Sequence, residues 1–115
     1  MEQNELVTAE KQVSDRLSQT ERSLKETRQA MTDFSQLSKR SIQFLEETLT
    51  AFGGSSERSV FQRIFDDQVF LGKKIQKDLE QKHDDLEQEY RRLTIRQEEL
   101  AKERQQLERE EADGN

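Results

Sequence analysis

The residues best suited to chemistry are a glutamate and the single histidine of the chain, Glu80 and His83. Their spacing places both side chains on one face of a helix, which is the E-x-x-H arrangement of carboxylate-bridged di-iron bundles. Such a site needs two of these steps, and a chain with one histidine supplies only half of them. We therefore expect His83 to be a polar residue beside a leucine seam, and we expect no metal site.

Other residue types needed for catalysis or cofactor binding are missing. The chain has no Cys, which excludes Cys–His nucleophiles and zinc clusters built on cysteine. Neither phosphate-loop pattern, G-x-G-x-x-G or G-x-x-x-x-G-K, occurs in the sequence. The acidic pairs, such as Asp66-Asp67, lack the glycine-containing ligand pattern of a calcium loop. We therefore expect no enzyme and no cofactor.

Length and composition favour long helices over a thick core. A chain of 115 residues predicts one domain, and its hydrophobic content of 30% is low for a compact globule. Disorder is disfavoured because Pro is absent and Leu recurs at regular spacing. The remaining class is an elongated helical protein with a solvated surface.

The charge balance and the first residues exclude two kinds of partner. There are 19 Lys and Arg against 25 Asp and Glu, and the most basic stretch, at Lys73, Lys74 and Lys77, is flanked by acidic residues. Nucleic acid needs a basic stripe, so we expect no nucleic-acid binding. Residues 1–5 carry no basic segment, and no long apolar run follows. We therefore expect no signal peptide, no membrane insertion and a cytoplasmic location.

The apolar spacing predicts two long helices separated by one cluster of helix breakers, Gly53-Gly54-Ser55-Ser56. Apolar residues recur every three, four or seven positions on both sides of it, ending in strict leucine heptads from Leu79 to Leu107. A short link between amphipathic helices favours antiparallel neighbours. The predicted fold class is all-α, an extended, coiled-coil-like helical hairpin that forms a single domain over 1–115. Its predicted parts are helix 1 at about 4–52, the turn at about 53–56, helix 2 at about 57–110, and frayed ends at 1–3 and 111–115.

The turn and the seam carry three further expectations. Gly53 suits a left-handed C-terminal cap of helix 1, and with Gly54 it forms the turn. Counted back from the turn, Ser38 lies opposite Gly72, so these small residues are predicted to mark a close approach of the two backbones or of a third helix. Far from the turn, leucines alternate with polar seam residues such as Thr20, so that end is predicted to be poorly buried.

Bulky apolar residues gather near the turn and occupy more than one face of both helices. A bare hairpin would leave some of them in water, and contiguous exposed apolar surface marks a binding site. A helix that binds in an apolar groove uses anchors at i, i+3, i+4 and i+7. The predicted partner-binding residues are Phe44, Phe52, Val60, Phe61, Ile64, Phe65, Val69, Phe70 and Leu71.

A small helical hairpin with an aromatic-x-Gly turn, here Phe52-Gly53-Gly54, resembles the WxG-type proteins of bacterial type VII secretion, with Phe in place of Trp. The acidic helices, the aromatic mid-region and the run from Glu98 to Arg104 look like the small helical partners of LXG-domain toxins in Gram-positive bacteria. The resemblance implies a non-enzymatic adaptor or targeting chaperone. Such a protein binds the helical LXG domain, alone or beside a second small helical protein, and helps direct the toxin to the secretion system.

The chain departs from this family pattern in one respect. WxG-type export substrates often carry an aromatic residue followed four positions later by an acidic residue, whereas Tyr90 is followed there by Thr94. We therefore expect a partner to supply the export signal, so that this chain stays in the cytoplasm or leaves with its partner. The alternative function, favoured by the leucine heptads, is a self-associating structural coiled coil, which would form a homo-oligomer.

Overall fold

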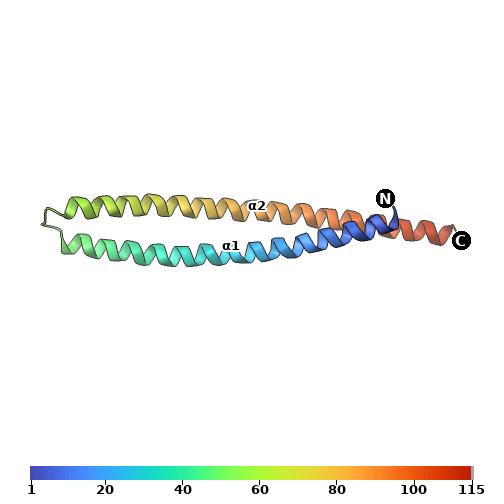
Figure 1. Cartoon of the computed structure of the whole chain (residues 1–115), viewed down its shortest axis with the longest axis horizontal. Helices are drawn as coiled ribbons and strands as arrows, with labels where there is room; N and C mark the ends of the chain where they lie inside the picture. The colour runs from blue at the N-terminus through green and yellow to red at the C-terminus, as the bar shows by residue number, and fades with distance from the viewer. Residues whose placement is uncertain (115) are drawn as a thin grey trace. The chain divides into compact units, whose positions relative to one another are not determined.

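The computed structural model describes residues 1–114, which form two helices joined by a short turn (Figure 1). Helix α1 spans Gln3–Ala51 and helix α2 spans Arg58–Asp113. The chain reverses at the turn, so the predicted all-α helical hairpin is confirmed. Helix α2 continues three residues beyond the predicted end at 110. Asn115, which closes the predicted frayed end 111–115, lies outside the described residues.

Both helices are rich in strong helix formers and contain no Pro. Pairs one turn apart on the surface add to helix stability, as between Glu87 Oε2 and Arg91 Nη2 at 3.6 Å. Each such pair contributes only about 0.2–0.5 kcal/mol. Most of the stability of the helices must therefore come from packing of their apolar sides.

The turn is closed by hydrogen bonds and not by a left-handed glycine. No glycine in the described chain has a positive φ, so the predicted left-handed cap at Gly53 is wrong. Instead, the Gly53 amide donates to the Thr50 carbonyl at 3.3 Å, which tightens the last turn of α1. The Arg58 guanidinium donates to the Gly53 carbonyl at 3.4 Å, and the Arg58 amide donates to the Ser55 carbonyl at 3.3 Å. These bonds serve the polar backbone groups that helix ends leave without partners.

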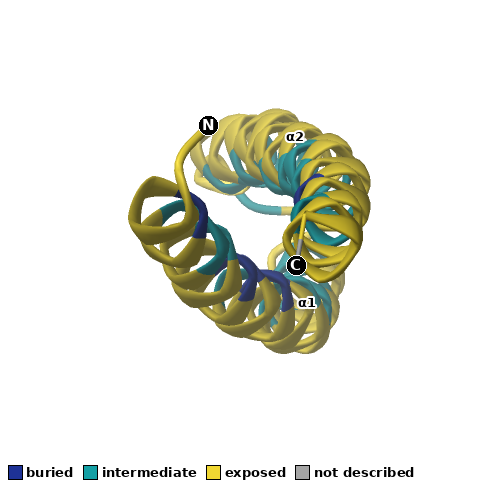
Figure 2. Ribbon diagram, turned by 90° about the vertical axis from the view of Figure 1, so that its right-hand side faces the viewer, coloured by how far each residue is buried: buried dark blue, intermediate teal, exposed yellow. Residues whose placement is uncertain are grey.

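The chain divides into two compact units, which we describe separately. The terminal unit contains residues 1–25 and 84–114, and the turn unit contains residues 26–83. Each unit consists of a stretch of α1 beside a stretch of α2. Within each, buried and half-buried residues lie along the facing sides of the helices, and exposed residues cover the rest (Figure 2). The single domain over 1–115 stays a prediction.

The terminal unit contains the most deeply buried side chains. Leu6 and Leu100 are 1% and 0% exposed, and Leu17 and Leu24 are also buried. Thr20 is buried beside them, and its hydroxyl donates to the Arg16 carbonyl at 2.8 Å. This bond within α1 satisfies the polar atom and leaves the methyl group free to pack in the seam. The prediction that this end is poorly buried is therefore wrong.

Polar side chains that pair between the helices explain this burial. The long stems of Arg, Glu and Tyr are apolar, so side chains that reach across a seam cover the leucines beneath them. Polar seam positions in this unit therefore contribute to burial, and the Glu10 Oε1 atom that faces Arg104 is itself buried. The pairs are Arg16 Nη2–Glu89 Oε1 at 2.8 Å, Arg104 Nε–Glu10 Oε1 at 3.2 Å and Tyr90 Oη–Glu21 Oε1 at 3.2 Å.

The turn unit contains more bulky apolar residues but buries them less. Of residues 26–83, all of which are described, only Thr27 is buried. Half-buried side chains such as Leu45 and Phe65 form its seam. The Ser38 hydroxyl oxygen lies 3.4 Å from the position that a Cβ on residue 72 would take, so Gly72 faces α1 at close range. This unit leaves much of its apolar surface in contact with water.

Candidate partner-binding surface

The structure divides the nine predicted partner-binding residues by their exposure. Phe61, Phe65 and Val69 are half-buried and belong to the seam of the turn unit. The other six are exposed, with Phe44 at 67% and Phe70 at 70%. The remaining exposed members of the set are Phe52, Val60, Ile64 and Leu71.

An aromatic pair holds the two helices together at the turn. The Phe52 and Phe61 rings lie with their centroids 4.8 Å apart and their planes tilted by 32°, a geometry that aromatic pairs favour. The Ser55 hydroxyl donates to the Phe52 carbonyl at 3.0 Å. The pKa of the Glu57 carboxyl lies below its usual value, chiefly because the carboxylate accepts a hydrogen bond from its own backbone amide, and the nearby Ser55 and Ser56 hydroxyls lower it further. The turn is thus fixed by local contacts.

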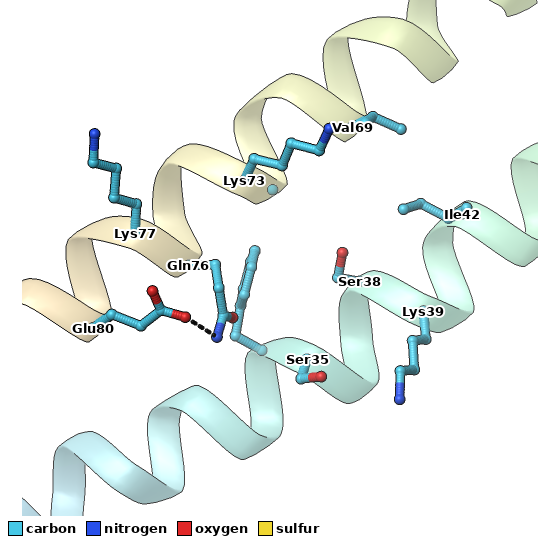
Figure 3. Close-up of a pocket in the computed structure, with 11 residues that line it drawn as sticks. Ser35, Ser38, Lys39, Ile42, Val69, Lys73, Gln76, Lys77 and Glu80 are labelled. Atoms are coloured by element: carbon cyan, nitrogen blue, oxygen red, sulfur yellow. Dashed lines mark hydrogen bonds between the residues drawn. The ribbon is translucent and has the colours of Figure 1, made fainter.

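One side of the turn-unit seam holds an open groove of about 390 Å³ (Figure 3). Apolar side chains of Phe34, Ile42 and Val69 line it, together with the small residues Ser38 and Gly72. Lysines stand along its edges. In Figure 3, Lys39 and Lys77 extend away from the seam on opposite sides, and Lys73 runs along α2 towards Val69. We call this surface the lysine groove.

Exposed apolar residues form one stripe on each helix of the turn unit. On α2 they follow steps of four, seven and four residues, which place them on one side of the helix. On α1 two exposed residues lie seven positions apart and share a side in the same way. The stripes are Val60, Ile64, Leu71 and Ile75 on α2, and Leu37 and Phe44 on α1.

Both stripes lie on the side of the seam opposite the lysine groove. Lys39 follows Leu37 by two residues on α1, and Lys73 follows Leu71 by two residues on α2. Two residues correspond to a rotation of about 200° around a helix. Because the lysines line the groove, the leucines must flank the seam on its other side. We call this surface, made by the six stripe residues, the apolar face.

The apolar face includes two residues that the sequence prediction missed, Leu37 and Ile75, which are 63% and 41% exposed. Their spacing contained the signal, since Leu37 lies seven residues before Phe44 and Ile75 lies four residues after Leu71. Phe70, by contrast, was predicted to bind the partner but does not belong to either stripe. It lies two residues before Gly72, which faces α1, and therefore on the side of α2 that points away from the seam.

Glu80 and His83, the two residues of the E-x-x-H pattern, form hydrogen bonds with different neighbours. The Gln76 amide donates to the Glu80 carboxylate at 3.3 Å, and the Arg28 guanidinium donates to His83 Nε2 at 3.3 Å. The lone pair on that ring nitrogen accepts the arginine N–H. His83 thus joins α2 to α1 as a half-buried polar residue of the seam.

Two further findings concern the class of protein. Within residues 1–114, neither helix combines the length and the hydropathy needed to cross a membrane. Comparison of the chain with protein-family models, with curated proteins and with solved structures gave no match in any of the three.

Proposed function

We propose that the chain is a non-enzymatic helical adaptor or targeting chaperone. It binds the helical LXG domain of a toxin, alone or beside a second small helical protein, and helps direct the toxin to the type VII secretion system. It acts in the cytoplasm and leaves the cell, if at all, together with its partner. The observation that carries the proposal is the apolar face of the turn unit.

The apolar face has the chemistry and the periodicity of a helix-binding surface. Exposed residues from both helices flank one side of the seam, including Phe44, Ile64 and Leu71. Large contiguous apolar patches on soluble proteins mark interaction sites, and parallel rows of helical side chains accept a further helix between them. A long helical partner would cover residues that the hairpin leaves in water.

The leucine heptads support the adaptor more than the alternative, a self-associating structural coiled coil. The five heptad leucines from Leu79 to Leu107 are half-buried or buried within the chain's own hairpin, and Leu100 is fully buried. They are therefore already used in the internal seam. Self-association would have to use the apolar face, which is the surface assigned here to the partner.

Co-expression of the chain with an LXG domain, followed by size exclusion with light scattering, tests the proposal. We expect a stable complex that contains both chains. The double variant Phe44→Asp/Leu71→Asp should weaken the complex by at least about tenfold, because each buried apolar side chain contributes roughly 1.5–3 kcal/mol and a buried charge adds a desolvation cost.

The matched control is Val7→Asp/Ile95→Asp. Both residues are exposed and apolar, and both lie in the terminal unit, so this control makes similar chemical changes outside the apolar face. It should leave the complex intact. A chain that elutes alone beside every LXG domain tested, or equal loss of binding in the two double variants, would count against the proposal. A stable homo-oligomer that Phe44→Asp/Leu71→Asp dissociates would support the structural alternative instead.

A further inference from the structure

The side of the turn unit opposite the apolar face offers a different chemistry. Phe34, Ile42 and Val69 give the lysine groove apolar walls, whereas Lys39 and Lys73 place ammonium groups on the two helices beside it (Figure 3). The whole chain carries a net charge of -6. A positive surface on this protein is therefore local, and it coincides with a groove.

The positive region is bounded along the helices. Seven residues nearer the turn than Lys39 on α1, the equivalent position is occupied by Glu46, and seven residues nearer the turn than Lys73 on α2 it is occupied by Asp66. At the other end of the groove, the Glu80 carboxylate accepts the hydrogen bond from Gln76. The lysines therefore favour a short acidic segment and not an extended polyanion, because acidic residues beyond both ends would repel a longer one.

The apolar walls of the groove narrow the choice of ligand. Phosphate groups alone would leave Phe34, Ile42 and Val69 in contact with water. A ligand that covers these walls and also pairs with the lysines needs acidic and apolar side chains together.

We propose that the lysine groove is a second docking surface, separate from the apolar face, and that it binds an acidic amphipathic α-helix of a partner protein. Apolar side chains of that helix pack on Ile42 and Val69, and its Asp and Glu side chains reach Lys39 on one side and Lys73 on the other. Gly72 has no side chain to obstruct the approach of the helix. With the apolar face on the other side of the seam, the hairpin could contact two helical segments at once.

A designed peptide provides the direct probe. It is a side-chain-stapled helix with Leu along one side and Glu on both flanks, carries a fluorophore, and is titrated with the full chain while anisotropy is measured. We expect saturable one-to-one binding that weakens as NaCl is raised, since salt screens exposed charges. The same peptide with Lys in place of Glu should bind at least about tenfold more weakly, because several attractive charge pairs become repulsive.

Charge reversal in the groove locates the binding site. Lys39→Glu/Lys73→Glu/Lys77→Glu should weaken binding of the acidic peptide by at least about tenfold, because the ion pairs with Lys39 and Lys73 are lost and three negative charges then repel the peptide. The control Lys11→Glu/Lys25→Glu/Lys102→Glu makes the same charge change at exposed lysines of the terminal unit. It should change binding by less than about twofold. Circular dichroism checks that both triple variants keep their helix content.

Three outcomes would overturn the proposal. The first is equal affinity for the acidic and the basic peptide, and the second is equal loss of binding in the two triple variants. The third is self-association of the chain, measured by sedimentation, that the groove variant abolishes and the control does not, because a second copy would then fill the groove. The apolar-face variant Phe44→Asp/Leu71→Asp should bind the peptide like the unchanged chain, so this test and that of the adaptor function fail independently.

Discussion

The terminal unit and the turn unit pack the same two helices in different ways. In the terminal unit, a few leucines such as Leu6 and Leu100 lie almost completely out of water. In the turn unit, bulkier residues are more numerous, yet Phe44 and Phe70 remain mostly exposed. Local apolar content is therefore a poor guide to burial in a two-helix protein. A narrow seam accommodates only a limited number of side chains, and additional bulky residues must face outward.

The polar contacts beside the apolar stripes differ in direction from those that cross the seam elsewhere. In the terminal unit, Arg16–Glu89 and Arg104–Glu10 join α1 to α2, and Arg28–His83 joins them at the end of the turn unit farthest from the turn. Nearer the turn, Gln76 bonds to Glu80 within α2, and Gln62 bonds in the same way to Asp66. Contacts that run along one helix leave the sides of the seam open. This difference supports the assignment of partner binding to the turn unit.

The strongest test of this comparison replaces one leucine in each unit. Leu100→Ala should lower the free energy of unfolding by about 2–3 kcal/mol, because it removes a fully buried side chain and leaves a cavity. Leu71→Ala should change it by no more than about 0.5 kcal/mol, since Leu71 lies on the exposed apolar face. Urea denaturation followed by circular dichroism measures both changes.

Matched circular dichroism spectra before denaturation are the control for this pair, because both replacements keep helix-forming residues. Equal destabilisation by the two replacements would mean that Leu71 is also covered in solution. That result would remove the contrast between the units, and repeating the measurement at several protein concentrations would show whether a second copy covers Leu71.

The fold could be predicted from the sequence because its signals are local and periodic. The seven-residue leucine steps and the breaker at Gly53-Gly54 define two helices and the position of the turn. The distribution of burial was predicted wrongly, because each polar seam residue was considered without its partner. Arg16 and Glu89 are 73 positions apart in the sequence, so no local pattern shows that they cover the leucines together.

The candidate surface was predictable in part for the same reason. The concentration of aromatics near the turn indicated the correct region, but the sequence did not distinguish Phe61, which packs in the seam, from Phe44, which is exposed. That distinction depends on the rotation of each helix about its axis when the two pack. The lysine groove was not predicted, because Lys39 and Lys73 approach one side of the seam only after the chain has reversed.

A smaller effect is expected at the turn, which belongs to the less buried unit. A Cβ on residue 54 would have no neighbouring atom within 4 Å, and Gly54 has no positive φ. Gly54→Ala should therefore raise the free energy of unfolding by about 0.4–1 kcal/mol, because alanine restricts the unfolded chain more than glycine does. Urea denaturation measures the gain, and slower amide hydrogen exchange in the turn unit would locate it.

Gly53→Ala is the matched control for this change. A Cβ there would lie 3.3 Å from Arg58 Nη1, which donates to the Gly53 carbonyl. The arginine would have to shift, so this replacement should stabilise the chain less than Gly54→Ala. Loss of stability in Gly54→Ala would show that the turn needs a backbone conformation that alanine does not adopt.

Acid should weaken the turn unit through Glu57. The pKa of this carboxyl lies below its usual value of 4.5 in the folded chain, so the unfolded chain binds the proton more tightly. The contribution of Glu57 to stability is therefore complete above the unfolded pKa and is lost as the pH falls through the folded pKa. An NMR titration of the carboxyl carbon measures the shift. Ser55→Ala should move the pKa part of the way back towards 4.5, and no movement would show that the backbone amide alone lowers it.

Alkali should act on the terminal unit through Tyr90, whose hydroxyl donates to the Glu21 carboxylate at 3.2 Å. This hydrogen bond and the negative charge of Glu21 raise the pKa of Tyr90 above its usual value of 10.0. Its contribution to stability is therefore complete below the unfolded pKa and is lost as the pH rises through the folded pKa.

Tyr90 is the only tyrosine in the chain, so an absorbance titration of the phenolate reports on this contact alone. Glu21→Gln should lower the pKa towards 10.0, whereas Glu46→Gln, a change in the turn unit, should leave it unchanged. If the titration curve of Glu21→Gln is identical to that of the unchanged chain, the contact between α1 and α2 at Tyr90 does not form in solution. The arginine pairs would then be the polar contacts that join the two helices in the terminal unit.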